Sequence, residues 1–109
     1  MDLPSVYVFL DYRVFLRTWF DACKRARPGY TYATFAAEAG CSRSALANVM
    51  SGARTPRPRT LDAFARAMGL GPGEREQLGL LVELAASRDV RHRRALLERV
   101  LQNARAHRP

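Results

Sequence analysis

Apolar residues recur at every third or fourth position along most of this 109-residue chain, with polar residues between them. That period matches α-helices with one buried face. It predicts helices over residues 11–25, 31–39, 43–50, 58–68, 74–87 and 89–106, while Val6-Tyr7-Val8-Phe9 has the pattern of a short extended arm. Alanine and leucine are abundant and β-branched residues are few, which favours helix over strand. We therefore expect a compact all-α fold of five to six helices.

Each predicted helix carries apolar positions that form the expected core. They are Tyr12, Phe15, Leu16, Trp19, Cys23 and Ala26 in the first helix, Phe35, Ala36 and Ala39 in the second, Leu46 and Val49 in the third, Leu61, Phe64, Ala65 and Met68 in the fourth, and Val90, Leu97, Val100, Leu101 and Ala104 in the sixth. The fifth helix is apolar nearly all round, at Leu78, Leu80, Leu81, Val82, Leu84 and Ala85. The aromatic cluster of Phe15, Trp19 and Phe20 has the spacing of core packing, and no polar group accompanies it as a ligand cage would need.

Two of these helices meet at a very short turn. Thr31 can begin the first by accepting a hydrogen bond from the amide of Ala33 or Thr34. Gly40 follows its last residue, where a positive φ is expected, and Ser42 can cap the next helix. Further along, Gly71-Pro72-Gly73 reads as a break between helices.

Positive charge gathers in the middle of the chain. The sequence has 18 lysines and arginines against 10 acidic residues, a formal net charge of +8. Residues 41–69 hold five arginines and a single acidic residue, Asp62. Such a block favours a polyanionic partner, of which nucleic acid is the usual one. The alternative is a solvated surface kept soluble by arginine, and composition alone does not decide between the two.

Neither an enzyme nor a cofactor or metal site is expected, because the chain offers few of the required residues. It has two cysteines, Cys23 and Cys41, and two histidines, His92 and His107. No serine–histidine–aspartate set, phosphate-binding glycine loop or metal-ligand spacing appears. Two cysteines are also too few for a disulfide scaffold. With no apolar run of ~20 residues and no secretory signal, we expect a cytoplasmic, nucleoid-associated protein without membrane contact.

Between residues 30 and 70, small and apolar residues follow a fairly specific spacing. The motif comprises Phe35-Ala36, Ala39-Gly40-Cys41-Ser42, Leu46, Val49, Gly52-Ala53-Arg54-Thr55-Pro56, Leu61, Phe64-Ala65 and Met68-Gly69-Leu70. It resembles the lambda-repressor-like helix-turn-helix domains of the Cro/C1 type, also called the XRE family. The resemblance implies a DNA-binding head over residues 1–70, with the helix-turn-helix unit at about 31–51, and a C-terminal helical extension over 71–109.

A narrower resemblance covers most of the chain. It begins at Tyr12-Arg13-Val14-Phe15-Leu16-Arg17-Thr18-Trp19-Phe20 and continues through Leu80-Leu81-Val82-Glu83 and the arginine-rich helix that follows. These segments resemble a group of bacterial predicted regulators in which such a head precedes a larger C-terminal domain of unknown function. On this resemblance the chain is either a short stand-alone member or the head alone.

The family resemblance also implies which residues contact DNA. The outward face of helix 43–50 would read bases in the major groove, and the N-terminal amides of helix 31–39 would hold a phosphate, together with arginines of the following loop. The base-reading residues are then Arg43, Ser44, Ala47 and Asn48, and the phosphate contacts are Tyr32, Ala33, Arg54, Arg57 and Arg59. The alternative for each is an ordinary solvated side chain, which is our expectation for Arg66.

The sequence thus predicts a sequence-specific, double-stranded DNA-binding transcriptional regulator, a repressor or autoregulator. Because one such domain contacts few bases, we expect a homodimer on paired half-sites, formed through helices 74–87 and 89–106. The alternative is that helix 89–106 folds back onto its own chain and covers the apolar surface, so that the protein is a monomer. Two other functions stay open: an antitoxin-like or accessory subunit that holds a partner protein, and a nucleoid or RNA-coating protein without sequence preference.

Overall fold

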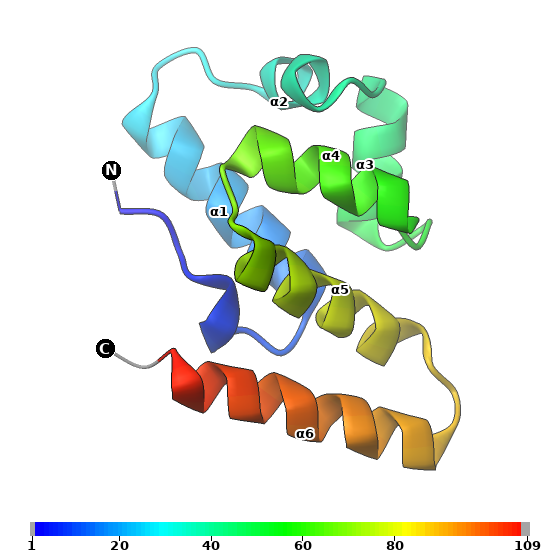
Figure 1. Cartoon of the computed structure of the whole chain (residues 1–109). Helices are drawn as coiled ribbons and strands as arrows, with labels where there is room; N and C mark the ends of the chain where they lie inside the picture. Colours follow the sequence, from blue (N-terminus) through cyan, green and yellow to red (C-terminus); the bar gives the residue numbers. More distant parts are fainter. Residues whose placement is uncertain (1, 108–109) are drawn as a thin grey trace.

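The computed structural model describes residues 2–107, which form six α-helices and one short 3-10 helix, without a strand. In chain order the elements are η1 (Val6–Val8), α1 (Tyr12–Ala26), α2 (Tyr32–Ala39), α3 (Arg43–Ser51), α4 (Pro58–Met68), α5 (Pro72–Ala86) and α6 (Val90–Ala106). Helices α2 and α3 lie at one end of the molecule and α6 at the other, with α1, α4 and α5 between them (Figure 1). The predicted all-α fold is confirmed.

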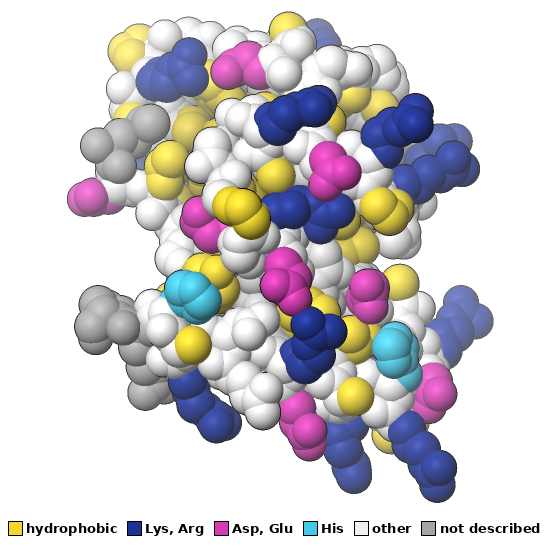
Figure 2. All heavy atoms as spheres, viewed as in Figure 1, with side chains coloured by type: hydrophobic (Ala, Val, Ile, Leu, Met, Phe, Trp, Pro, Cys, Tyr) yellow, Lys and Arg dark blue, Asp and Glu magenta, His cyan; other side chains and the backbone are white. Residues whose placement is uncertain are grey.

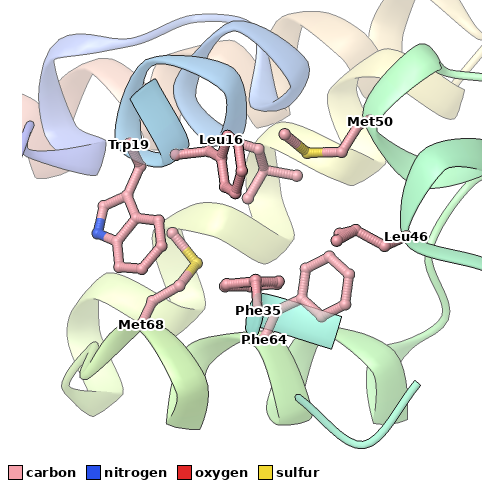
Figure 3. A pocket seen from close by; sticks show the side chains of 8 residues that line it. Leu16, Trp19, Phe35, Leu46, Met50, Phe64 and Met68 are labelled. Atoms are coloured by element: carbon pink, nitrogen blue, oxygen red, sulfur yellow. The ribbon is translucent and has the colours of Figure 1, made fainter. Parts of the chain in front are cut away.

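Aromatic side chains from three helices meet at the centre of the core. The rings of Trp19 and Phe35 lie edge to face with centroids 5.6 Å apart, and those of Phe35 and Phe64 do so at 5.2 Å. Figure 3 shows side chains from α1 to α4 converging around a void of about 10 Å³. An apolar void of this size is too small for a ligand. The predicted cluster of Phe15, Trp19 and Phe20 is buried and belongs to this core, as its spacing predicted.

The predicted apolar stripes of α1 to α4 are buried, with one exception. Ala26, the last residue of α1, is exposed. The stripe of α6 also differs from the prediction, because only Val100 of its expected members is fully buried, together with Leu96. Val90, Leu97 and Leu101 are exposed, because α6 packs on α5 and η1 through the side of the helix that carries Leu96 and Val100.

The expected extended arm at residues 6–9 is wrong, because Val6–Val8 form a 3-10 turn. The Ser5 hydroxyl caps this turn by accepting a hydrogen bond from the Tyr7 amide (3.3 Å). Val6 is fully buried, and the Tyr7 ring stacks on His107 at a centroid distance of 3.9 Å. A contact one hundred residues away thus helps to fix a segment that local pattern could not.

Helix α5 begins at Pro72, two residues earlier than predicted, so of the expected break at Gly71-Pro72-Gly73 only Gly71 lies outside the helix. Pro72 occupies the first turn, which proline tolerates because its missing N–H has no partner there anyway. The Gly71 amide donates to the Glu74 carboxylate (3.0 Å) and closes the end of the helix. The large apolar residues of α5 are all buried within the chain, packed against α1, α4, α6 and η1, whereas Ala85 and Ala86 at the end of the helix are exposed.

Candidate nucleic-acid interface

The corner between α2 and α3 is built from local features that the sequence predicted. The Thr31 hydroxyl accepts a hydrogen bond from the Thr34 amide (3.3 Å), and the Ser42 hydroxyl accepts one from the Ala45 amide (3.0 Å). Between them Gly40 has a φ of +70°, a conformation that residues with a side chain rarely adopt. Helix α3 therefore starts directly after a turn of three residues.

Helix α3 is anchored along its inner face. Leu46, Val49 and Met50 are all at most 6% exposed and pack into the core. The first two were predicted to face inward, and Met50 extends the same stripe. The end of α3 is also covered: a Cβ atom at Gly52 would lie only 2.6 Å from Nη1 of Arg13, so the Arg13 side chain from α1 lies against this turn. The core and α1 together fix the direction in which the opposite face of α3 points.

The opposite face of α3 carries the predicted base-reading residues. Arg43, Ser44 and Ala47 are exposed, while Asn48 is half-buried. The three exposed residues and Tyr32 of α2 line one open concavity of about 450 Å³. Sequence neighbours on α3 and the first residue of α2 thus meet at a single hollow surface.

A basic groove runs along the other flank of α3. Arg54 and Arg57 line it beside Ala45 of α3, and its volume is about 280 Å³. Arg59 is exposed two residues after Arg57, as the second residue of α4. We call Arg43, Arg54, Arg57 and Arg59 the arginine rim; none of the four takes part in an ion pair among residues 2–107. Lys and Arg side chains gather over α3 and α4 at the upper right of Figure 2.

The one acidic residue of this basic block is already paired. Asp62 accepts a hydrogen bond from Nε of Arg75 (2.7 Å), and the same guanidinium donates to the Pro58 carbonyl (3.2 Å). Arg75 comes from α5, so it ties α5 to the first turns of α4. Because Arg75 offsets the Asp62 charge, the arginine rim keeps its positive potential.

Lys24 is a basic residue at this surface that the sequence analysis missed. It lies in the last turn of α1 and, with Thr31, Tyr32 and Arg43, lines a second concavity of about 300 Å³. Asp21 also lines that concavity and moderates its charge. Nothing in the sequence around Lys24 indicated this position. Lys24 reaches the surface only because the fold brings the end of α1 next to the start of α2.

The remaining chemistry of the described residues is sparse. Residues 2–107 contain no group of three or more His, Cys, Asp or Glu side chains placed to hold a metal ion. Burial raises the pKa of both the Cys23 and the Cys41 thiols, which keeps them protonated. None of the helices in this part of the chain combines the length and apolarity that crossing a bilayer requires.

Comparison with known proteins agrees with this geometry. A family model described as a helix-turn-helix domain matches residues 24–78, half of the chain, and this range contains α2, α3 and the arginine rim. No curated protein and no solved structure matches the sequence. The match covers the corner at Gly40 and the small and apolar residues between 30 and 70 on which the resemblance to the Cro/C1 type was based. The chain therefore belongs to the helix-turn-helix family of DNA-binding domains.

Proposed function

We propose that the chain is a sequence-specific transcriptional regulator that inserts α3 into the major groove of double-stranded DNA. One observation carries this proposal: the exposed face of α3 lies between an open concavity and a groove edged by arginines that form no ion pair in the described chain. The major groove, about 12 Å wide, admits a helix in this way. Phosphates on either side of the groove would then meet the arginine rim.

The base contacts follow from the chemistry of the exposed face. Arg43 can donate two hydrogen bonds to N7 and O6 of guanine, and the Asn48 amide can pair with N6 and N7 of adenine. Ser44 can bond a base edge or a phosphate, and the Ala47 methyl group can contact the methyl group of thymine. Because Asn48 is half-buried, its amide has fewer rotamers to lose on binding than a fully exposed one would have.

The phosphate contacts supply affinity and its salt dependence rather than sequence preference. Arg54, Arg57 and Arg59 are exposed, and their guanidinium groups are free to pair with phosphate oxygens. The first amides of α2, at Tyr32 and Ala33, point out of a helix N-terminus, where an anion is favoured. The Thr34 amide is occupied by the Thr31 cap, so it does not contribute.

Selection of bound sites from a random duplex pool tests the proposal directly. A recurrent motif is the expected result, and a pool that stays random would refute base reading. On the selected site, Asn48→Ala should cost about 1–3 kcal/mol and relax the preference at one base position. Equal losses for Asn48→Ala on the selected and a random duplex would remove Asn48 from the base-reading set.

A matched pair of arginine variants tests the arginine rim. Arg57→Gln should weaken binding to every duplex and reduce the slope of log K against log salt by about 0.9, the value for one phosphate contact. Arg66→Gln removes the same charge further along α4, at an exposed position outside the rim, and should leave that slope unchanged. Equal slopes for the two variants would mean that the rim acts only through net charge.

We extend the proposal to repression, because a protein bound over a promoter excludes polymerase. A reporter placed under a promoter that contains the selected site should lose expression when the chain is produced. The homodimer stays a prediction, which the symmetry of the selected motif tests. The single chain provides no uncovered apolar face on α5 for it, since the large apolar residues there are buried.

A second candidate function, an accessory subunit that holds another protein, is favoured by a different observation. Helix α6 exposes Val90, Leu97 and Leu101 at the end of the molecule opposite α3 (Figure 1). This surface has no role in the DNA contacts proposed above.

A further inference from the structure

Helix α6 is firmly seated on the rest of the chain along one edge. Leu96 and Val100 are buried, and the fully buried Gln77 of α5 donates from Nε2 to the Val100 carbonyl (3.1 Å). Its Oε1 accepts a hydrogen bond from Asn103 (2.9 Å). Arg93 donates to the Leu84 carbonyl at the end of α5 (2.8 Å). These bonds fix the rotation of α6 about its own axis, so the side chains on its other faces point in defined directions.

One of those faces carries a line of exposed apolar residues. Val90 is 71% exposed, and Leu97 and Leu101 are each 37% exposed. Their spacing of seven and four residues places them on one side of the helix. We call Val90, Leu97 and Leu101 the α6 stripe. The spacing is that of the seam by which one amphipathic helix packs against another.

The residues beside the α6 stripe are mostly positive. Arg91, Arg94 and Arg105 are exposed next to it, with Glu98 as the one acidic neighbour on the same flank. None of the three arginines takes part in an ion pair within residues 2–107. The flank therefore presents charge that a partner helix could satisfy.

A second copy of the chain is a poor occupant of this face. Two antiparallel α6 helices that place Leu97 of one copy opposite Leu101 of the other bury these leucines, but each Val90 then lies beyond the last turn of the other α6. In that register Arg91 of each copy lies near Arg105 of the other, and the two Glu98 side chains lie near the symmetry axis. Like charges facing each other across a helix pair are destabilising.

We propose that α6 binds an amphipathic helix of another protein, whose apolar seam is flanked by Asp and Glu. With 17 residues, α6 is about 25 Å long and matches a partner helix of about the same length. Acidic residues beside the partner seam would pair with Arg91, Arg94 and Arg105. The site lies at the end opposite α3, so it does not depend on the proposed DNA contacts (Figure 1).

A pair of synthetic peptides tests the proposal on the full chain. Each spans about three heptads with leucine at both core positions, and the flanking positions are glutamate in one peptide and lysine in the other. The glutamate peptide should bind with a Kd of about 1–10 µM in fluorescence anisotropy, and the lysine peptide at least about tenfold more weakly. Raising the salt from about 0.05 to about 0.5 M should weaken the glutamate peptide.

Two variants separate the apolar and the charged parts of the site. Leu97→Gln with Leu101→Gln should abolish binding of the glutamate peptide, whereas Gln102→Ala, at an exposed position outside the stripe, should not change it. Arg91→Glu with Arg94→Glu should reverse the preference and favour the lysine peptide. This charge reversal keeps the stripe intact and places acidic residues in the first two turns of α6, near the positive end of the helix dipole.

Three results would overturn the proposal. One is no binding of the glutamate peptide to the unchanged chain, and another is equal binding of the two peptides. The third is a dimer in sedimentation of the free chain that the Leu97 and Leu101 changes dissolve, because a second copy would then occupy the face. The affinity of each variant for the selected duplex is measured in parallel, so failure of the DNA-binding proposal is distinguished from failure at α6.

Discussion

The turn residues on either side of α3 allow a quantitative test of how this helix is held. Gly40 and Gly52 have φ values of +70° and +83°, and replacing either by alanine forces a side chain into the left-handed region. That conformation costs an L-residue about 1–2 kcal/mol. Alanine also restricts the unfolded chain, which returns about 0.4–1 kcal/mol. A Cβ atom at Gly40 meets nothing within 4 Å, so we expect Gly40→Ala to destabilise by about 1 kcal/mol from backbone strain alone.

Gly52→Ala should cost slightly more, because its Cβ would lie 2.6 Å from Nη1 and 2.9 Å from Cδ of Arg13. The Arg13 side chain is long and about half exposed, so it can move and give up its 3.3 Å ion pair with Asp11. An exposed pair of this kind contributes little to stability, because water screens it. In an Arg13→Ala background the excess of Gly52→Ala over Gly40→Ala should vanish.

Urea unfolding followed by far-ultraviolet circular dichroism measures these differences. Gly40→Asn is the matched control, because asparagine tolerates the left-handed region better than alanine does, and it should fall between glycine and alanine. A Gly40→Ala variant as stable as the unchanged chain would refute the strain argument. So would an excess at Gly52 that persists without the Arg13 side chain.

Three further predictions concern single contacts. Ser42→Ala removes the cap of α3 and should cost about 1 kcal/mol in urea unfolding, whereas Ser42→Asp should retain most of it. Asn103→Ala leaves Oε1 of the buried Gln77 without its donor and should cost about 1–3 kcal/mol, while Gln102→Ala beside it costs little. Burial raises the pKa of Tyr30 from 10.0 to about 12, so the stability that the neutral Tyr30 hydroxyl contributes is complete below pH 10 and is lost as the pH rises to about 12. The Tyr30→Phe variant should therefore unfold at a higher pH than the unchanged chain in an alkaline titration. An unchanged midpoint of that unfolding transition would contradict this.

Local signals made the helix-turn-helix unit predictable from sequence. Thr31 and Ser42 mark helix starts by their cap chemistry, and Gly40 marks the end of a helix by its tolerance of a positive φ. Each of these effects acts within a few residues, so the sequence around it contains the whole cause. The positions of the rim arginines, in the loop after α3 and at the helix starts, could also be predicted, because they follow from the helix boundaries.

Features that depend on distant partners were not predictable in this way. Val6–Val8 turn instead of extending because Val6 enters the core and Tyr7 stacks on His107. Gln77 is fully buried because its amide bonds across to α6, although glutamine is a surface residue by type. The sequence pattern of α6 shows a broad apolar face, and only its packing against α5 and η1 decides which part of that face stays exposed.

The two proposed surfaces should act independently of each other. Helix α6 packs mainly on α5 and η1, whereas the inner face of α3 packs into the core shared with α1, α2 and α4. A ligand shifts an equilibrium only by its differential affinity for two states, and α6 has no contact by which a bound helix would favour one position of α3 over another. The affinity for the selected duplex should therefore change by less than about twofold when the glutamate peptide saturates α6. A larger change would reveal a second arrangement of α5 between the two sites.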